Sequence, residues 1–230
     1  MRLSIVIPVL NEADGIEPFL SSLQPFRSQG HEIILADGGS TDATTQHAAS
    51  LVDQVIQSPR GRAQQMNAGA AVARGDVIFF LHADSQLPKD SAALILIGRQ
   101  HAGRRWGRFD IRLSGDRFMF RVVEWSMNTR SRLTGISTGD QGLFVERTLF
   151  ESVGGFPLMP LMEDIAICGL LKQIEPPLCL GERIIISSRR WEENGVWRTI
   201  FLMWRLRFAY WCGADPAQLA RIYYPHSVHG

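Results

Sequence analysis

Short apolar runs alternate with longer amphipathic stretches over residues 1–100. The runs are too short for helices and end in turn residues, so they predict buried strands at 3–9, 32–37, 52–56 and 76–81. The stretches between them repeat apolar residues at helical spacing and predict helices at 16–23, 42–50, 61–73 and 88–100. This alternation predicts an α/β fold, with a Rossmann-like, mostly parallel central sheet flanked by helices. The run at 76–81 is the most hydrophobic and is expected at the centre of the sheet.

The second half of the chain has a less regular pattern. It predicts strands at 106–113, 141–145 and 182–188, and helices at 117–132, 163–172, 197–212 and 216–224. We expect residues 1–195 to form the main domain and residues 196–230 to form an amphipathic helical appendage. The helix at 197–212 is rich in aromatic residues and contains three arginines. Three roles stay open for it: packing on the domain, a homodimer contact through residues 196–224, or contact with a membrane surface.

Composition narrows the class of protein. The chain has 230 residues, is 45% hydrophobic and carries a formal net charge of +1, so no global field indicates a nucleic-acid partner. Its 3 cysteines are widely spaced and form no metal motif, which favours reduced thiols. No apolar run approaches the roughly 20 residues of a membrane span, and no signal peptide is expected before the first strand. We expect a cytoplasmic protein, at most peripheral on the inner face of the membrane.

Charged residues follow the predicted strands, where a rigid sheet would display them. Asp37 ends the second strand, Asp84 follows the central strand, and Glu163 with Asp164 opens a helix. Arg190 follows the last strand. Such a set suits an anionic ligand held partly by Mg²⁺ or Mn²⁺, which prefer carboxylate oxygens and bridge phosphates.

Each of these features also has an ordinary structural interpretation. Asp37 and Gly38 form a common turn pair, and acids are favourable at any helix N-terminus. Arg190 could be a surface cation and Trp191 a core aromatic. Their order along the chain, each beside a strand end, favours the functional interpretation.

Five ordered motifs resemble those of the family 2 glycosyltransferases, which have the glycosyltransferase A-type nucleotide-sugar-binding fold. The similar segments are 4–12 with its Pro-x-x-Asn-Glu turn, 37–42, 61–69, 81–84 at the place of Asp-x-Asp, and 154–156 followed by 163–164. The resemblance runs from residue 4 to about residue 191. The combination Gly-Arg-Ala-x-Gln-Met-Asn with His-Ala-Asp is similar to a small bacterial subgroup, the radical-SAM/selenodomain-associated transferases.

The resemblance implies transfer of a sugar from a UDP- or GDP-sugar to an acceptor hydroxyl, usually with inversion. It assigns residues 1–195 to nucleotide-sugar binding and catalysis, Asp164 as the general base and Glu163 as its neighbour. It implies that Asp84 holds the metal and that Asp37 contacts the nucleobase. The other implied nucleotide-sugar contacts are Pro8, Asn11, Glu12, Gly38, Arg62, Asn67, His82, Ala83 and Arg190. Asp140, Gln141 and Trp191 are candidates for the sugar or the acceptor.

Two departures from the family pattern affect these expectations. His82 replaces the first Asp of Asp-x-Asp, which weakens the expected metal site; it contacts the sugar or ribose, or is a core histidine. The Arg-Arg-Trp segment at 189–191 lacks the glutamine of processive members and is expected after a strand rather than on a helix, so polymer synthesis is not expected. For residues 139–142, a plain glycine turn is an equally good interpretation.

Other functions are less well supported. A nucleotidyltransferase would have a basic, Gly-rich loop after the first strand, whereas residues 11–14 are acidic. A catalytically silent nucleotide-sugar-binding or scaffold protein is consistent with His82 but not with the intact pair of Glu163 and Asp164. A dinucleotide-binding oxidoreductase is not expected, because no Gly-x-Gly-x-x-Gly follows a strand.

Overall fold

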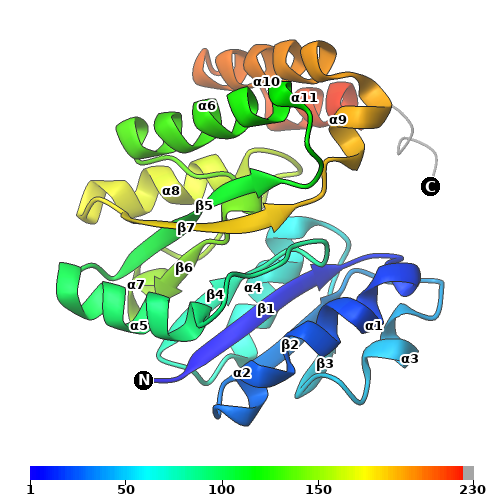
Figure 1. The fold of residues 1–230 in the computed structure, drawn as a ribbon, viewed down its shortest axis with the longest axis vertical. Helices are drawn as coiled ribbons and strands as arrows, with labels where there is room; N and C mark the ends of the chain where they lie inside the picture. The colour runs from blue at the N-terminus through cyan, green and yellow to red at the C-terminus, as the bar shows by residue number, and fades with distance from the viewer. Residues whose placement is uncertain (225–230) are drawn as a thin grey trace.

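The computed structural model describes residues 1–224, apart from the side chains at positions 190 and 194. Its strands are β1 (Leu3–Val9), β2 (Glu32–Asp37), β3 (Gln54–Gln57), β4 (Val77–Phe80), β5 (Trp106–Leu113), β6 (Phe144–Glu146) and β7 (Leu178–Ile186). In this part of the chain they form one 7-stranded sheet in the order β3-β2-β1-β4-β6-β5-β7 (Figure 1). The predicted α/β fold is confirmed, and β4 is the central strand, as its hydrophobicity predicts.

Most strand pairs are parallel, as the alternation of elements predicts. β1 runs parallel to β2 and β4, β2 to β3, and β5 to β7. Only β6 reverses direction within residues 1–224, since it is antiparallel to both β4 and β5. Because β2 and β4 flank β1 on opposite sides, the strand order reverses between β1 and β4. In open α/β sheets, ligands bind at this switch point, outside the carboxyl ends of the strands.

Helices cover both faces of the sheet. They are α1 (Ala13–Ser22), α2 (Gln24–Ser28), α3 (Thr44–Ala48), α4 (Arg62–Val72), α5 (Ser91–Ala102), α6 (Phe118–Thr134), α7 (Arg147–Ser152), α8 (Glu163–Ile174), α9 (Arg189–Asn194), α10 (Val196–Trp211) and α11 (Pro216–Tyr223). Alternate residues of each strand point to opposite faces. In β1, Ile5 and Ile7 therefore join the apolar cluster under α1, α5 and α6, whereas Val6 joins the cluster under α4, α7 and α8.

Several predicted elements need correction. Helices α2, α7 and α9 are not in the prediction, and residues 139–141 form a 3₁₀ turn, so β6 begins at Phe144 rather than at 141. β7 begins at Leu178 rather than at 182, because a register shift between Phe109 and Asp110 of β5 lets both ends of the strand pair. The expectation that Arg-Arg-Trp does not lie on a helix is wrong, since it forms the start of α9.

The C-terminal helices pack on the rest of the protein. Leu206 of α10 and Leu219 of α11 are buried with Met162, which immediately precedes α8. Within residues 1–224, none of the helices has both the length and the apolar character that crossing a membrane requires.

Candidate active site

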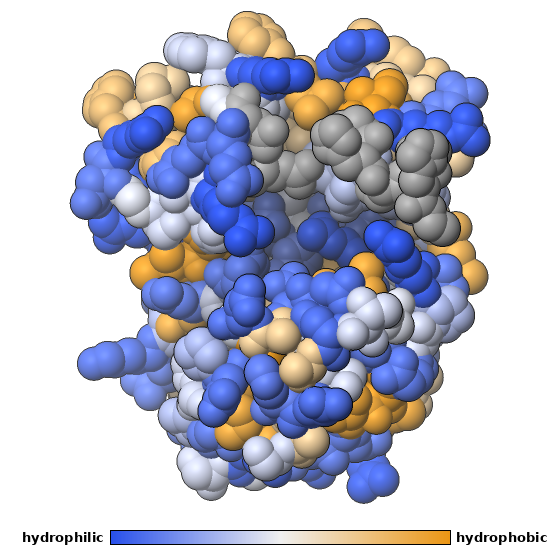
Figure 2. Space-filling view, turned by 90° about the vertical axis from the view of Figure 1, so that its right-hand side faces the viewer, coloured by the Kyte–Doolittle hydropathy of each residue, from blue (hydrophilic) through white to orange (hydrophobic). Residues whose placement is uncertain are grey.

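A cleft of ≈ 2200 Å³ opens at the switch point between β1 and β4. Its walls are the turns that follow these two strands, the first turn of α4, residues 138–140 and the start of α8. In the space-filling view, the molecule is hollowed between its upper and lower parts, and hydrophilic residues lie around the hollow (Figure 2). The cleft brings together most of the residues that the sequence predicts as a site: Pro8, Asn11, Glu12, Arg62, His82, Ala83, Asp84, Asp140, Glu163, Asp164 and Trp191.

Asp164 lies in the first turn of α8, where the helix dipole favours a carboxylate. Its Oδ2 accepts a hydrogen bond from the N–H of Gly139 at 2.9 Å, and its Oδ1 accepts one from the N–H of Ile165 at 2.7 Å. Burial raises the pKa of Asp164 above its ordinary value, and these two N–H groups oppose that rise only in part. A carboxylate held in place with a raised pKa is suited to accept a proton near neutral pH.

Glu163 is the first residue of α8 and is buried. Burial and then the charge of Asp164 raise the pKa of Glu163. The preceding residue, Met162, has φ +73°, which is unusual for a residue other than glycine. Such backbone strain costs about 1–3 kcal/mol and is typical of functional sites. Here it turns the chain so that both acids begin the helix beside the cleft.

His82 contacts the turn that holds Asp164. Its Nδ1 lies 3.3 Å from Oδ1 of Asp140, and its side chain is only 13% exposed. A Cβ atom on Gly139 would lie 2.8 Å from Nε2 of His82, so a glycine at this position gives the imidazole room. The turn at 139–140 therefore links the strand end that carries His82 to the start of α8.

Arg62 is the first residue of α4 and lines the cleft. A cation gains nothing from the positive end of a helix dipole, so its position here points to an anionic ligand shared with the helix N-terminus. Arg62 is exposed to the cleft; partial desolvation there opposes its charge, but the groups of Tyr224, Asp140 and Glu163 raise its pKa above the ordinary value. The cleft thus presents a fixed positive charge.

Two other residues of the cleft, Glu12 and Asp84, suit a hard cation. Burial, followed by the negative charge of Asp84, raises the pKa of Glu12, so these two carboxyl groups repel each other. A divalent cation would relieve that repulsion, and carboxylate oxygens are the ligands that Mg²⁺ and Mn²⁺ prefer. Across residues 1–224, His, Cys, Asp and Glu side chains do not form a group of three or more that could hold a metal alone. Asp84 and Glu12 are the carboxylates of this part of the cleft that could contribute ligands to such an ion.

Asp37 and Gly38 do not line the cleft. The carboxylate of Asp37 is buried and accepts hydrogen bonds from the N–H groups of Gly39 and Ser40 and from the Ser40 hydroxyl. Gly38 lies against Gln65, since a Cβ there would come within 2.9 Å of the Gln65 amide carbon. Gln65 in turn donates to the carbonyls at the ends of β1 and β2, at positions 9 and 36. The structure gives Asp37 and Gly38 roles in shaping the turn after β2.

Asn67 also lies away from the cleft. Its side-chain nitrogen donates to the carbonyl of Phe156 at 2.8 Å, and its side-chain oxygen accepts from the N–H of Phe156 at 2.9 Å. The pair joins α4 to the Gly-Gly-Phe turn, 89 residues further along the chain. Asn67 is thus a structural clamp between two of the motifs.

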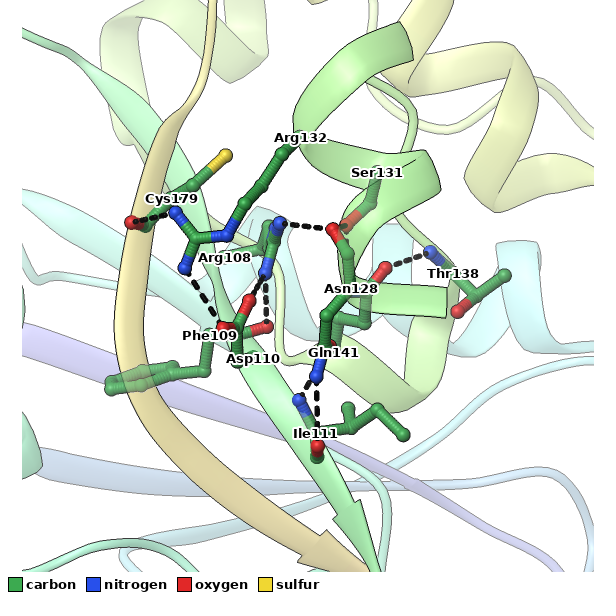
Figure 3. A network of polar contacts seen from close by, with 10 residues as sticks. All are labelled: Arg108, Phe109, Asp110, Ile111, Asn128, Ser131, Arg132, Thr138, Gln141 and Cys179. Atoms are coloured by element: carbon green, nitrogen blue, oxygen red, sulfur yellow. Dashed lines mark hydrogen bonds and ion pairs between the residues drawn. The ribbon is translucent and has the colours of Figure 1, made fainter. Parts of the chain in front are cut away.

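Gln141 belongs to a buried polar network under α6 (Figure 3). Its side-chain nitrogen donates to Ser131 at 3.0 Å, and its side-chain oxygen accepts from the N–H of Thr138 at 3.2 Å. In the same network, Arg108 and Arg132 both bind Asp110. The structure therefore uses Gln141 to fix the 139–141 turn, while its neighbour Asp140 reaches the cleft.

The cleft is also lined by apolar residues that the sequence analysis does not predict. The side chain of Arg190 lies outside the described residues, whereas Trp191 lines the cleft and also packs against the core. An apolar wall formed by residues 158–162 and by Met203 of α10 was not in the prediction. Tyr223 of α11 also lines the cleft. Periodicity alone gives no indication that helices beyond residue 195 contribute to the cleft.

Comparison with known proteins agrees with this arrangement. Residues 4–145 match the profile of "Glycosyl transferase family 2". The chain is 30% identical over 210 residues to a dodecaprenyl-phosphate galacturonate synthase of Rhizobium johnstonii, a match covering 85% of this chain. It spans only 61% of that relative's length.

Two solved structures share the architecture. S. aureus TarS in complex with UDP superimposes with a TM-score of 0.67 at 18% identity, over 81% of this chain and 60% of TarS. The mannosyltransferase PcManGT from Pyrobaculum calidifontis, in complex with GDP-Man and Mn²⁺, superimposes with a TM-score of 0.65 at 18% identity, over 98% of this chain and 70% of its own. These likenesses confirm the predicted A-type fold.

Proposed function

The chain belongs to glycosyl transferase family 2, and on that premise we propose that it transfers a sugar from a nucleoside diphosphate sugar to an acceptor hydroxyl in this cleft. The observation that carries the proposal is Asp164, a half-buried carboxylate with a raised pKa, which two backbone N–H groups fix in a cleft that also contains Arg62. A general base, a stabilised leaving group and an oriented site are what glycosyl transfer needs.

Asp164 acts as the base. It accepts the proton of the acceptor hydroxyl as the acceptor oxygen attacks the anomeric carbon, and the nucleoside diphosphate leaves from the opposite face with inversion. Glu163 lies beside it and stays protonated more readily than an exposed glutamate, because burial and Asp164 raise its pKa. The neighbouring turn at 139–140 holds the base in position through Gly139.

Two sources of positive charge would stabilise the leaving diphosphate. Arg62 and the N-terminus of α4 supply one. Asp84 would hold the second, a Mg²⁺ or Mn²⁺ ion that, when bound, neutralises charge on the leaving group as a Lewis acid. The donor is a UDP- or GDP-sugar, since TarS is described with UDP and PcManGT with GDP-Man and Mn²⁺. Asn11 and His82 also line the cleft and are candidates for nucleoside and sugar contacts.

The apolar wall at residues 158–162 and Met203 favours an acceptor with a hydrocarbon part beside its hydroxyl. The name of the Rhizobium relative, a dodecaprenyl-phosphate galacturonate synthase, supports an acceptor of this kind.

The described cysteines, Cys168, Cys179 and Cys212, are free thiols, which supports a reducing compartment such as the cytoplasm.

Thermal unfolding with UDP, GDP and dTDP, each with and without Mn²⁺, tests donor binding. A ligand at 100 times its dissociation constant adds about 2.7 kcal/mol to the free energy of unfolding. We expect UDP or GDP to raise the melting temperature, and more so with Mn²⁺. If no nucleotide raises it, the proposal fails. Release of nucleoside diphosphate from the matching donor then separates a transferase from a silent nucleotide-sugar-binding protein.

A further inference from the structure

One side of α10 carries a row of aromatic side chains that the protein leaves exposed. The row consists of Trp197, Phe201, Trp204, Phe208 and Trp211, which we call the aromatic stripe. These side chains are between 61% and 81% exposed. At about 100° per residue, their spacing of three or four positions places all of them within an arc of about 80°. They form one continuous face of the helix.

The opposite side of α10 attaches the helix to the protein. Thr199 and Leu206 are buried, and Leu206 packs with Met162 and Leu219. These positions lie about 180–200° around the helix from Trp197. α10 therefore packs on the protein through its buried side. The aromatic stripe lies on the other side of the helix, away from this packing.

The same end of the molecule has a second exposed apolar row. Phe118, Trp125 and Leu133 of α6 are 69–83% exposed, and α6 and α10 both run along the upper end of the molecule (Figure 1). In the space-filling view, apolar residues gather at this upper end, interspersed with hydrophilic ones (Figure 2). Exposed apolar residues gathered at one end of a molecule in this way indicate an interaction site.

The charges beside the aromatic stripe indicate which partner fits. α10 contains three arginines, Arg198, Arg205 and Arg207, and no aspartate or glutamate. Arg198 and Arg205 are exposed and lie about 80–100° from Trp197 on one flank, and Arg207 lies on the other. Tryptophan favours the headgroup level of a bilayer, and arginine beside it is attracted to anionic lipids. A second copy docking on this face through a two-fold axis would bring like charges together.

We propose that the aromatic stripe docks the protein on an anionic membrane surface, with α10 lying in the plane of the interface. The inference goes beyond sugar transfer and does not depend on the identity of the donor. It has a consequence for the site, because Met203 and Leu206 on the inner side of the same helix line the cleft. Docking would hold the cleft beside the bilayer.

Flotation of the full chain with lipid vesicles tests the proposal. We expect the protein to float with vesicles of phosphatidylcholine and phosphatidylglycerol, and less with phosphatidylcholine alone. Combining Phe201→Ser, Trp204→Ser and Phe208→Ser should weaken the partition coefficient by roughly tenfold for each ring removed. Arg198→Gln and Arg205→Gln should weaken binding to anionic vesicles by roughly fivefold each and leave binding to neutral vesicles unchanged.

A matched control replaces exposed apolar residues elsewhere. Val55→Ser, Ile97→Ser and Ile174→Ser on β3, α5 and α8 should float like the unaltered chain. Equal melting temperatures of all variants exclude misfolding as the cause of a loss. The proposal is overturned if the unaltered chain does not float with anionic vesicles, or if the aromatic variant floats as well as the control. It is also overturned if sedimentation velocity shows a dimer that the aromatic variant turns into a monomer, since a second copy would then cover the stripe.

Discussion

Replacing Asp164 by asparagine is the most direct test of the site. The amide has the size of the carboxylate but cannot accept the proton of an acceptor hydroxyl. A general base contributes about 10²–10⁴-fold to rate, so we expect kcat to fall by that factor. Each oxygen of Asp164 accepts one N–H, at 2.9 and 2.7 Å. The amide nitrogen cannot accept, so one hydrogen bond worth about 0.5–1.5 kcal/mol is lost.

That structural loss is small and partly offset, because the variant no longer buries a carboxylate whose pKa burial raises. For a chain of this size, 1 kcal/mol corresponds to roughly 2–4 °C, so the melting temperature should change by only a few degrees. The assay is release of nucleoside diphosphate at saturating donor, together with the nucleotide-induced thermal shift, which should persist.

Asp53→Asn is the matched control, since Asp53 also accepts a backbone N–H, that of Ile33 at 2.8 Å, but lies outside the cleft. It should retain full turnover. Near-full turnover by Asp164→Asn would refute the assignment of Asp164 as the base. Loss of turnover together with loss of nucleotide binding would show that Asp164 holds the fold of the cleft rather than the proton.

Further predictions concern the pH profile, the metal and the clamp. Asp140→Asn removes a negative charge that raises the pKa of Asp164, so the base stays ionised to lower pH. The acidic limb of the pH–rate profile should therefore move to lower pH. An acidic limb at the same pH would contradict an effect of Asp140 on Asp164. Asp84→Asn should raise the Mn²⁺ concentration for half-maximal rate by roughly 10–100-fold or more, and an unchanged metal requirement would remove Asp84 as the ligand. Asn67→Ala leaves the N–H and carbonyl of Phe156 without their partner, which should lower the free energy of unfolding in urea by about 1–3 kcal/mol. Its nucleotide affinity by calorimetry should be unchanged, and a large loss of affinity would argue for a binding role.

The strands with the clearest pattern are those that the sequence predicts best. β1 and β5 have the predicted bounds, 3–9 and 106–113, because the apolar run of β1 and the alternating pattern of β5 both end at turn residues. β7 is longer than predicted, since Glu182 and Arg183 interrupt its apolar pattern while its backbone still pairs with β5. Backbone pairing with a neighbour overrides the local pattern here, and a pattern of residues does not show which neighbour a strand has.

The meeting of Glu12 and Asp84 in one cleft was predictable for a related reason. The switch between β1 and β4 brings residues after both strands into one cleft, which the alternation of strands and helices already implies. The hydrogen-bond partners of Asp37 and Asn67 were not predictable from the residues alone. The carboxylate of Asp37 accepts hydrogen bonds within its own turn, and the partner of Asn67 lies 89 residues away.

The late position of β6 in the chain matters during synthesis, because β6 is the strand that pairs with one edge of β4. β1 to β4 can pair as soon as they leave the ribosome, but one edge of β4 is closed only by residues 144–146. At about 5–20 residues per second, that edge, Val-Ile-Phe-Phe, waits on the order of 3–13 s for its partner. An apolar edge of this kind is a template for pairing with another nascent chain. A fragment that stops before Phe144 should therefore accumulate as aggregates, although it contains most of the family's motifs.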